Sequence, residues 1–188
     1  MSFAQSARFC RNSVLALAVV AAGCSRDPET LKRKYVASGD AYMAQKKYDE
    51  AIIEYRNATQ QDNRYGEARY KLAAAYIQTG DGSKALGEAV RAADLLPLDE
   101  DAQLQATNLL ILAGRFADAQ DRASKLLERD PHNVRATVAL GNALAGLKDL
   151  NGAVGQLEEA IRLDPTRAGS YTNLATLQLG AGRLKEAE

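Results

Sequence analysis

Several residue types that define small secreted or metal-binding folds are scarce in this chain. Its 188 residues include two cysteines, Cys10 and Cys24, one histidine, His132, and no tryptophan. Two cysteines cannot form a disulfide framework, and no set of Cys and His has the spacing of a metal site. Basic and acidic residues number 24 each, so there is no basic excess of the kind that marks a nucleic-acid surface.

Aromatic residues are also few, at 6% of the chain, whereas alanine and leucine are abundant. This composition favours helices that pack closely through small side chains. The apolar run Val14 to Ala22 follows Arg8 and Arg11 and is far shorter than the roughly 20 residues needed to span a bilayer. A short apolar run after a positive segment is typical of a secretory signal, which we exclude from the folded part.

The order Ala21, Ala22, Gly23, Cys24 resembles the lipobox of bacterial lipoproteins, although that family prefers leucine where Ala21 stands. The resemblance implies that residues 1–23 are a cleavable signal peptide and that the Cys24 thiol carries a lipid. Residues 24–31 would then be a short tether, and Ser25 points to the outer membrane, facing the periplasm. An ordinary signal peptide that happens to contain a cysteine is the alternative.

The rest of the chain repeats itself every 34 residues. One ladder is Ala51, Ala85, Ala119, Ala153 and Ala187, and a second is Ala58, Ala92, Leu126 and Ala160. A third, at the unit ends, is Asn63, Pro97, Pro131 and Pro165. A constant period without insertions predicts stacked copies of one small unit.

This unit resembles the tetratricopeptide repeat, with small residues at its close helix crossings and a glycine or proline at its turns. The resemblance implies an all-α solenoid, a right-handed superhelix of antiparallel helix pairs. The expected units are residues 32–65, 66–99, 100–133, 134–167 and 168–188, of which the third is degenerate and the fifth truncated. Gly80, Gly114 and Gly182 are expected to end helices in a left-handed conformation, with Lys46 and Lys148 at the same place in two other units.

The fifth unit stops where its second helix should begin, so we expect the chain to be a fragment of a longer array or a truncated product. Its first helix would have no partner within the unit, and we expect that helix to fray.

Signatures of catalysis are missing from the sequence, so we predict that the chain is not an enzyme and takes no cofactor or small-molecule substrate. A polar groove is expected instead, because the family lines a concave face with its first helices. The candidate groove residues on these first helices are Arg33, Asp40, Tyr70, Lys71, Asn108, Arg135, Asn142 and Asn173. Polar groups of this kind can pair with a peptide backbone or a partner's helix, whereas solvated surface is the alternative for each one.

These expectations combine into one functional interpretation. The chain would be a membrane-anchored scaffold that binds protein partners in a bacterial envelope assembly, export or exopolysaccharide process. The stretch from Cys24 to Asp62 is similar to the start of lipoproteins associated with exosortase systems. Two alternatives stay open: an accessory subunit that activates or positions an envelope enzyme, and the scaffold part of a larger protein with a catalytic domain.

Overall fold

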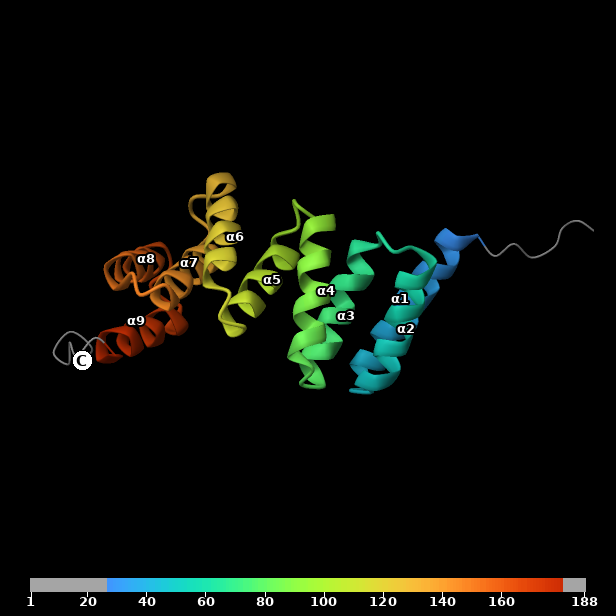
Figure 1. Ribbon diagram of the computed structural model, residues 1–188. Helices are drawn as coiled ribbons and strands as arrows, with labels where there is room; N and C mark the ends of the chain where they lie inside the picture. The colour runs from blue at the N-terminus through green and yellow to red at the C-terminus, as the bar shows by residue number, and fades with distance from the viewer. Residues whose placement is uncertain (1–26, 181–188) are drawn as a thin grey trace, which may run out of the picture.

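The computed structural model describes residues 27–180, which form nine α-helices and no strand. The predicted signal peptide at 1–23, the lipidation site Cys24 and the turn at Gly182 lie outside this range. The helices are α1 (Pro28–Ala44), α2 (Tyr48–Gln61), α3 (Gly66–Gln78), α4 (Gly82–Leu95), α5 (Glu100–Leu112), α6 (Phe116–Arg129), α7 (Val134–Gly146), α8 (Leu150–Leu163) and α9 (Ala168–Gly180). The all-helical solenoid predicted from the sequence is confirmed for the described part of the chain (Figure 1).

The first helix starts earlier than the repeat period predicts. Residues 24–31 were predicted to be a tether, but α1 begins at Pro28. The Asp27 carboxylate accepts hydrogen bonds from the backbone N–H groups of Glu29 and Thr30, both at 3.3 Å. Proline at the first helical position has the fixed φ that a helix needs, so Asp27 and Pro28 together nucleate the helix. Residues 28–31 therefore belong to α1 and not to the tether.

Each helix pair is closed by a tight turn at the predicted place. Lys46, Gly80, Gly114 and Lys148 have φ values of 59°, 78°, 73° and 68°, which confirms the left-handed conformation expected there. The next residue donates its N–H back across the turn, as from Arg115 to the Leu110 carbonyl at 2.8 Å. This bond is the one that defines a Schellman helix end, and it reverses the chain so that the second helix packs against the first.

The alanine ladders lie where helices cross. Ala51, Ala85, Ala119 and Ala153 are fully buried, and so are Ala58, Ala92 and Ala160. Small side chains let the helices approach closely at these crossings, because the ridges of one helix fill the grooves of the next. Leu126 takes the same place in the third unit and is also buried. The sequence ladders therefore mark the packing contacts of the solenoid.

The helix pairs stack side by side into an elongated array with α1 and α9 at opposite ends (Figure 1). Helix α5 packs on α7 and α7 on α9, whereas α4 and α6, or α6 and α8, make no comparable contact within residues 27–180. In the C-terminal part of the array the first helices of neighbouring units thus lie closer together than the second helices. The array therefore curves there with the first helices on its inner side.

The apolar core is divided along the array. One cluster of buried residues runs from Val36 on α1 to Leu109 on α5, and a second joins Leu104 on α5 to α6 and α7. A third, small cluster groups Leu110 with Ala119 and Ala143. Helix α5 contributes to all three, so it connects the N-terminal and C-terminal parts of the solenoid.

Candidate functional site

The candidate groove residues all lie on first helices. Arg33 and Asp40 are on α1, Tyr70 and Lys71 on α3, Asn108 on α5, Arg135 and Asn142 on α7, and Asn173 on α9. None of them is buried. We call the surface formed by these eight residues the inner face.

An ion pair connects the inner face of the first two units. Lys71 Nζ lies 2.9 and 2.8 Å from the two carboxylate oxygens of Asp40, and the Tyr55 hydroxyl donates to Asp40 Oδ1 at 2.7 Å. Burial raises the pKa of Tyr55, and the hydrogen bond to the Asp40 carboxylate raises it further. Asp40 is thus held from two sides, which fixes α1 against α3.

A second ion pair connects the third and fourth units. Arg135 Nη1 lies 2.7 Å from Asp101 Oδ1 and 3.6 Å from Glu100 Oε1. Tyr70 faces the same charges: burial raises its pKa first, and the carboxylates of Asp101 and Asp99 raise it further. Tyr70 therefore lies on the inner face beside a charged edge shared by α3, α5 and α7.

The third connection is uncharged. Asn173 Nδ2 donates to Asn142 Oδ1 at 3.2 Å and joins the fourth unit to the fifth. Asn108 is exposed and makes no side-chain hydrogen bond within residues 27–180. The inner face thus changes from paired charges near α1 to neutral amides near α9.

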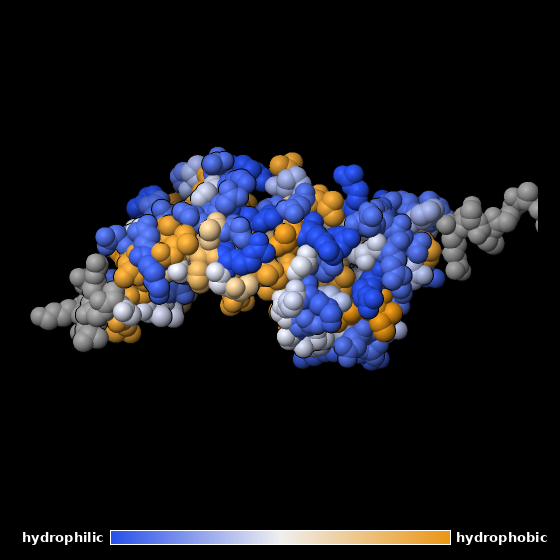
Figure 2. Space-filling view, viewed as in Figure 1, coloured by the Kyte–Doolittle hydropathy of each residue, from blue (hydrophilic) through white to orange (hydrophobic). Residues whose placement is uncertain are grey.

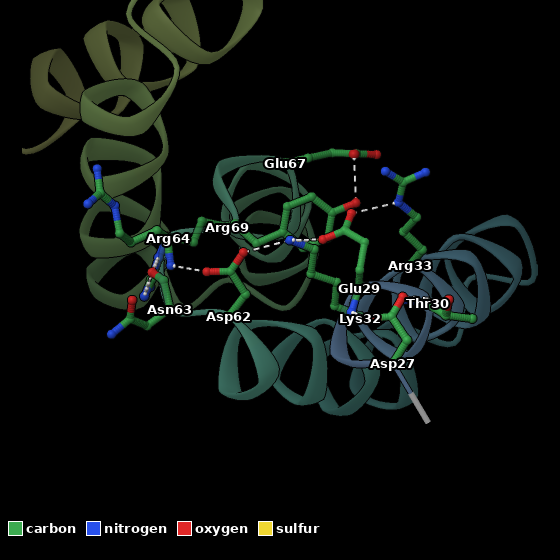
Figure 3. Close-up of polar contacts among 11 residues, drawn as sticks. Asp27, Glu29, Thr30, Lys32, Arg33, Asp62, Asn63, Arg64, Glu67 and Arg69 are labelled. Atoms are coloured by element: carbon green, nitrogen blue, oxygen red, sulfur yellow. Dashed lines mark hydrogen bonds and ion pairs between the residues drawn. The ribbon is translucent and has the colours of Figure 1, made fainter. Parts of the chain in front are cut away.

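Arg33 belongs to a polar cluster around the start of α1 (Figure 3). Its guanidinium pairs with Glu29 at 2.8 Å, while Lys32 Nζ lies 2.7 Å from both Glu29 and Asp62. The Lys32 ammonium also stands over the Tyr65 ring, 4.6 Å from its centroid. Lys32 thereby ties α1 to the loop between α2 and α3. Arg33 and Asp40 line one open hollow together with Glu67 and Tyr65.

One spacing explains which candidates meet. Asp40 and Lys71 are 31 residues apart, and so are Asn142 and Asn173. At the same spacing Ala74 precedes Gln105 and Asn108 precedes Ala139, so an alanine stands where a pair would need a second polar side chain. An alanine side chain can neither accept nor donate a hydrogen bond, and the Gln105 Oε1 atom is buried without a hydrogen-bond partner.

Tyr55 and Asp101 hold two of the candidate residues in place but were not among the predicted site residues. Asp101 could have been found, because it precedes Arg135 by 34 residues and occupies the same place in the preceding unit. Opposite charges at one repeat spacing predict an ion pair between units. The contact of Tyr55 with Asp40 crosses within one unit and leaves no comparable periodic signal.

A cleft lies at the C-terminal end of the inner face, between α7, the start of α8, and α9. It is lined by Asn142, Lys148, Leu150, Leu157, Asn173 and Leu177. We call it the terminal cleft.

Figure 2 shows a largely hydrophilic surface on which hydrophobic residues gather in separate patches. Within residues 27–180 no helix is long and apolar enough to cross a bilayer, and no group of three or more His, Cys, Asp or Glu is placed to hold a metal ion.

These helix pairs match known repeats. Residues 39–80 match the family described as "TPR repeat", and residues 108–168 match the one described as "Tetratricopeptide repeat". The chain is therefore built of tetratricopeptide repeats, as the resemblance of its 34-residue unit implies.

Particular relatives are more distant. The chain is 38% identical over 84 residues to the probable UDP-N-acetylglucosamine–peptide N-acetylglucosaminyltransferase SPINDLY of Arabidopsis thaliana. That match covers 45% of this chain and 9% of the relative's length. MamA 41-end from Desulfovibrio magneticus RS-1 has a similar structure, with a TM-score of 0.73 and 18% identity over 83% of this chain and 88% of its own. YrrB, described as a TPR protein with an unusual peptide-binding site, has a TM-score of 0.68 and 17% identity over 81% and 79%.

Proposed function

We propose that this chain is a non-catalytic scaffold that binds protein partners along its inner face and is held at a bacterial membrane by a lipid on Cys24. The observation that carries the proposal is the set of polar pairs between units, Asp40 with Lys71 and Asn142 with Asn173. They fix neighbouring first helices relative to one another. The surface that a partner meets is therefore already ordered. Binding then loses less conformational entropy, which favours affinity.

The peptide-binding site that YrrB is described as having supports this reading, because it occurs on the same fold. Partner recognition by extended or helical segments depends on polar and apolar groups displayed at regular intervals. Here the 34-residue period supplies that regularity, and Tyr70 and Asn108 lie on the same face with accessible side chains.

The membrane part of the proposal depends on the sequence around Cys24. A single acyl chain gives marginal anchoring, whereas two or three chains hold a protein stably. Since α1 begins at Pro28, the scaffold would start four residues after the anchor. The partners would then be envelope proteins near the lipid surface, in an assembly, export or exopolysaccharide process.

A second candidate function follows from the resemblance to SPINDLY, a probable glycosyltransferase. The chain would in that case present substrates to, or position, a sugar-transferring enzyme of the envelope. The same experiment separates the two candidates, because it identifies the partner.

The test is photocrosslinking in cells from p-benzoylphenylalanine placed at Tyr70 or Asn108, with Glu128 on α6 as the control position. We expect discrete adducts from the two inner-face positions and none from Glu128, and mass spectrometry of the adducts distinguishes a structural partner from a glycosyltransferase. Adducts of equal intensity from all three positions, or none, would refute the inner-face scaffold.

The anchor is tested separately with Cys24→Ala. We expect this variant to lose incorporation of radiolabelled palmitate and to leave the membrane fraction or stay uncleaved. Unchanged retention of a cleaved Cys24→Ala protein would show that the anchor is wrong while leaving the scaffold intact.

A further inference from the structure

The place that corresponds to the terminal cleft one unit earlier is filled by an aromatic ring. The Phe116 ring, at the start of α6, lies against Gly146 at the end of α7, in the place that a side chain on residue 146 would occupy. One repeat further on, the equivalent residues are Leu150 and Gly180. No described atom lies within 4 Å of the place where a side chain on Gly180 would begin. The same place thus occurs in two units, and among the described atoms only the earlier copy is filled by an aromatic ring.

Leu150 leaves the second copy open because it is shorter than phenylalanine. It stays 37% exposed at the cleft mouth, whereas Leu157, which also lines the cleft, is 1% exposed. Together with Leu177 and Ala145, these residues form an apolar wall. Covering the apolar wall of this cleft with a large apolar side chain is favourable, at about 25 cal/mol per Å² of surface removed from water.

Two amides border this wall. After the bond between them at 3.2 Å, Asn142 keeps an N–H donor and Asn173 a carbonyl acceptor that have no other side-chain partner within residues 27–180. One donor beside one acceptor matches the carbonyl and N–H of a peptide group. The border of the cleft can therefore hold the backbone next to an inserted side chain.

The charge at the cleft mouth is positive. Lys148 lines the cleft and makes no ion pair within residues 27–180. The neighbouring Asp149 carboxylate is turned to the start of α8, where it accepts the Gly152 N–H at 3.0 Å. An acidic residue beside the inserted side chain would complement Lys148.

From these contacts we propose that the terminal cleft is a docking pocket for a partner peptide with an aromatic residue flanked by an acidic one. The aromatic ring takes the place that Phe116 takes one unit earlier, the peptide group bonds to Asn142 and Asn173, and the acidic side chain pairs with Lys148. The inference rests on the proposed function, since it names the chemistry of one partner segment on the same face.

The test uses a displayed library of random dodecapeptides selected on the whole protein and, in parallel, on Leu150→Phe. This substitution gives the second cleft the residue that fills the first, so we expect it to fold with an unchanged circular dichroism spectrum. Wild-type protein should enrich peptides with an aromatic next to Asp or Glu, and Leu150→Phe should not. For a selected peptide, replacing the aromatic by alanine should weaken binding about thirty-fold, as for a side chain that anchors an interface.

A second variant checks the charge. Lys148→Glu should shift selection away from acidic neighbours, while Lys46→Glu, at the same left-handed position three units earlier, should not.

Enrichment that is absent, or equal on wild type and Leu150→Phe, would overturn the docking pocket. A concentration-dependent dimer that Leu150→Phe abolishes would also overturn it, because a second copy would then be the occupant. If the docking pocket is wrong but crosslinks from position 70 persist in Leu150→Phe, the proposed scaffold function still stands. If wild-type protein gives no crosslinks from position 70, the scaffold function itself is refuted.

Discussion

Single residues decide how closely the units approach. Gly146 and Gly39 are examples, since the Phe116 ring fills the space above the first and the Tyr55 ring the space above the second. Gly155 and Gly87 are also helical glycines, but no described atom lies within 4 Å of the place where their side chains would begin. The same residue type therefore has opposite roles in one chain, and the surroundings determine which.

This contrast predicts opposite effects for one substitution. Gly146→Ala should lower the free energy of unfolding by about 1–3 kcal/mol, because the new methyl group displaces the Phe116 ring in a packed contact. Gly155→Ala should raise it by about 0.5–1 kcal/mol, because alanine loses less backbone entropy in a helix and meets no neighbour. Urea unfolding followed by circular dichroism measures both. A stabilised Gly146→Ala would mean that Phe116 does not pack against this glycine.

At the residue scale much could be predicted from the sequence. The buried alanines and the left-handed turns follow from the 34-residue period, because each is a local requirement repeated in every unit. The start of α1 was also readable, since Asp27 followed by Pro28 and Glu29 is a helix-capping pattern. The 34-residue period places the first unit boundary at Lys32 and gives no sign of this earlier start.

At the scale of elements, contacts between neighbouring first helices determine the inner face. Asp40 with Lys71 and Asn142 with Asn173 meet at a spacing of 31 residues, which differs from the 34-residue period. That difference reflects the fixed offset, along the helix axis, between one first helix and the next in the stack. Such an offset depends on the crossing geometry, so the family resemblance predicted the candidate residues but not their pairs.

The cluster around Lys32 links α1 to the following loop and should make stability depend on pH. The hydrogen bond from Lys32 lowers the pKa of Asp62, and the Arg64 N–H lowers it further. A carboxyl whose pKa is lowered in the folded state adds stability that is complete above its unfolded value of 3.8. That stability is lost as the pH falls through the lower folded value.

We therefore expect Asp62→Asn to lose stability less steeply than wild type as the pH is lowered from 5 to 2. Thermal unfolding at a series of pH values measures the difference. Glu158→Gln serves as the control, because Glu158 is exposed and makes no side-chain hydrogen bond or ion pair within residues 27–180. Identical pH profiles for wild type and Asp62→Asn would contradict a role for the Lys32 pair in holding α1.

At the scale of the whole molecule, stability should vary along the array. Helix α3 buries six residues between its neighbours, whereas α9 buries only Ser170 and Gln178. In a solenoid each unit is stabilised by its own packing and by the adjacent interfaces, so weakly packed helices open first.

Hydrogen exchange followed by mass spectrometry should therefore find the fastest helical exchange in α9 and the slowest in α3 or α4. A selected dodecapeptide that occupies the terminal cleft should slow exchange in α9 and leave α3 unchanged. Full protection of α9 in the free protein would contradict the expectation that this helix frays.

The ion pairs of the inner face also bear on how fast partners arrive. Asp40 is neutralised by Lys71, and Asp101 by Arg135, so opposite charges cancel within a few ångströms. A surface of this kind projects little long-range field into solvent, and collisions with a partner are not guided by it. Association at this paired part of the inner face, away from Lys148, should thus proceed at the ordinary unsteered rate and change little with salt. Selectivity there must arise after contact, through the lifetime of the complex.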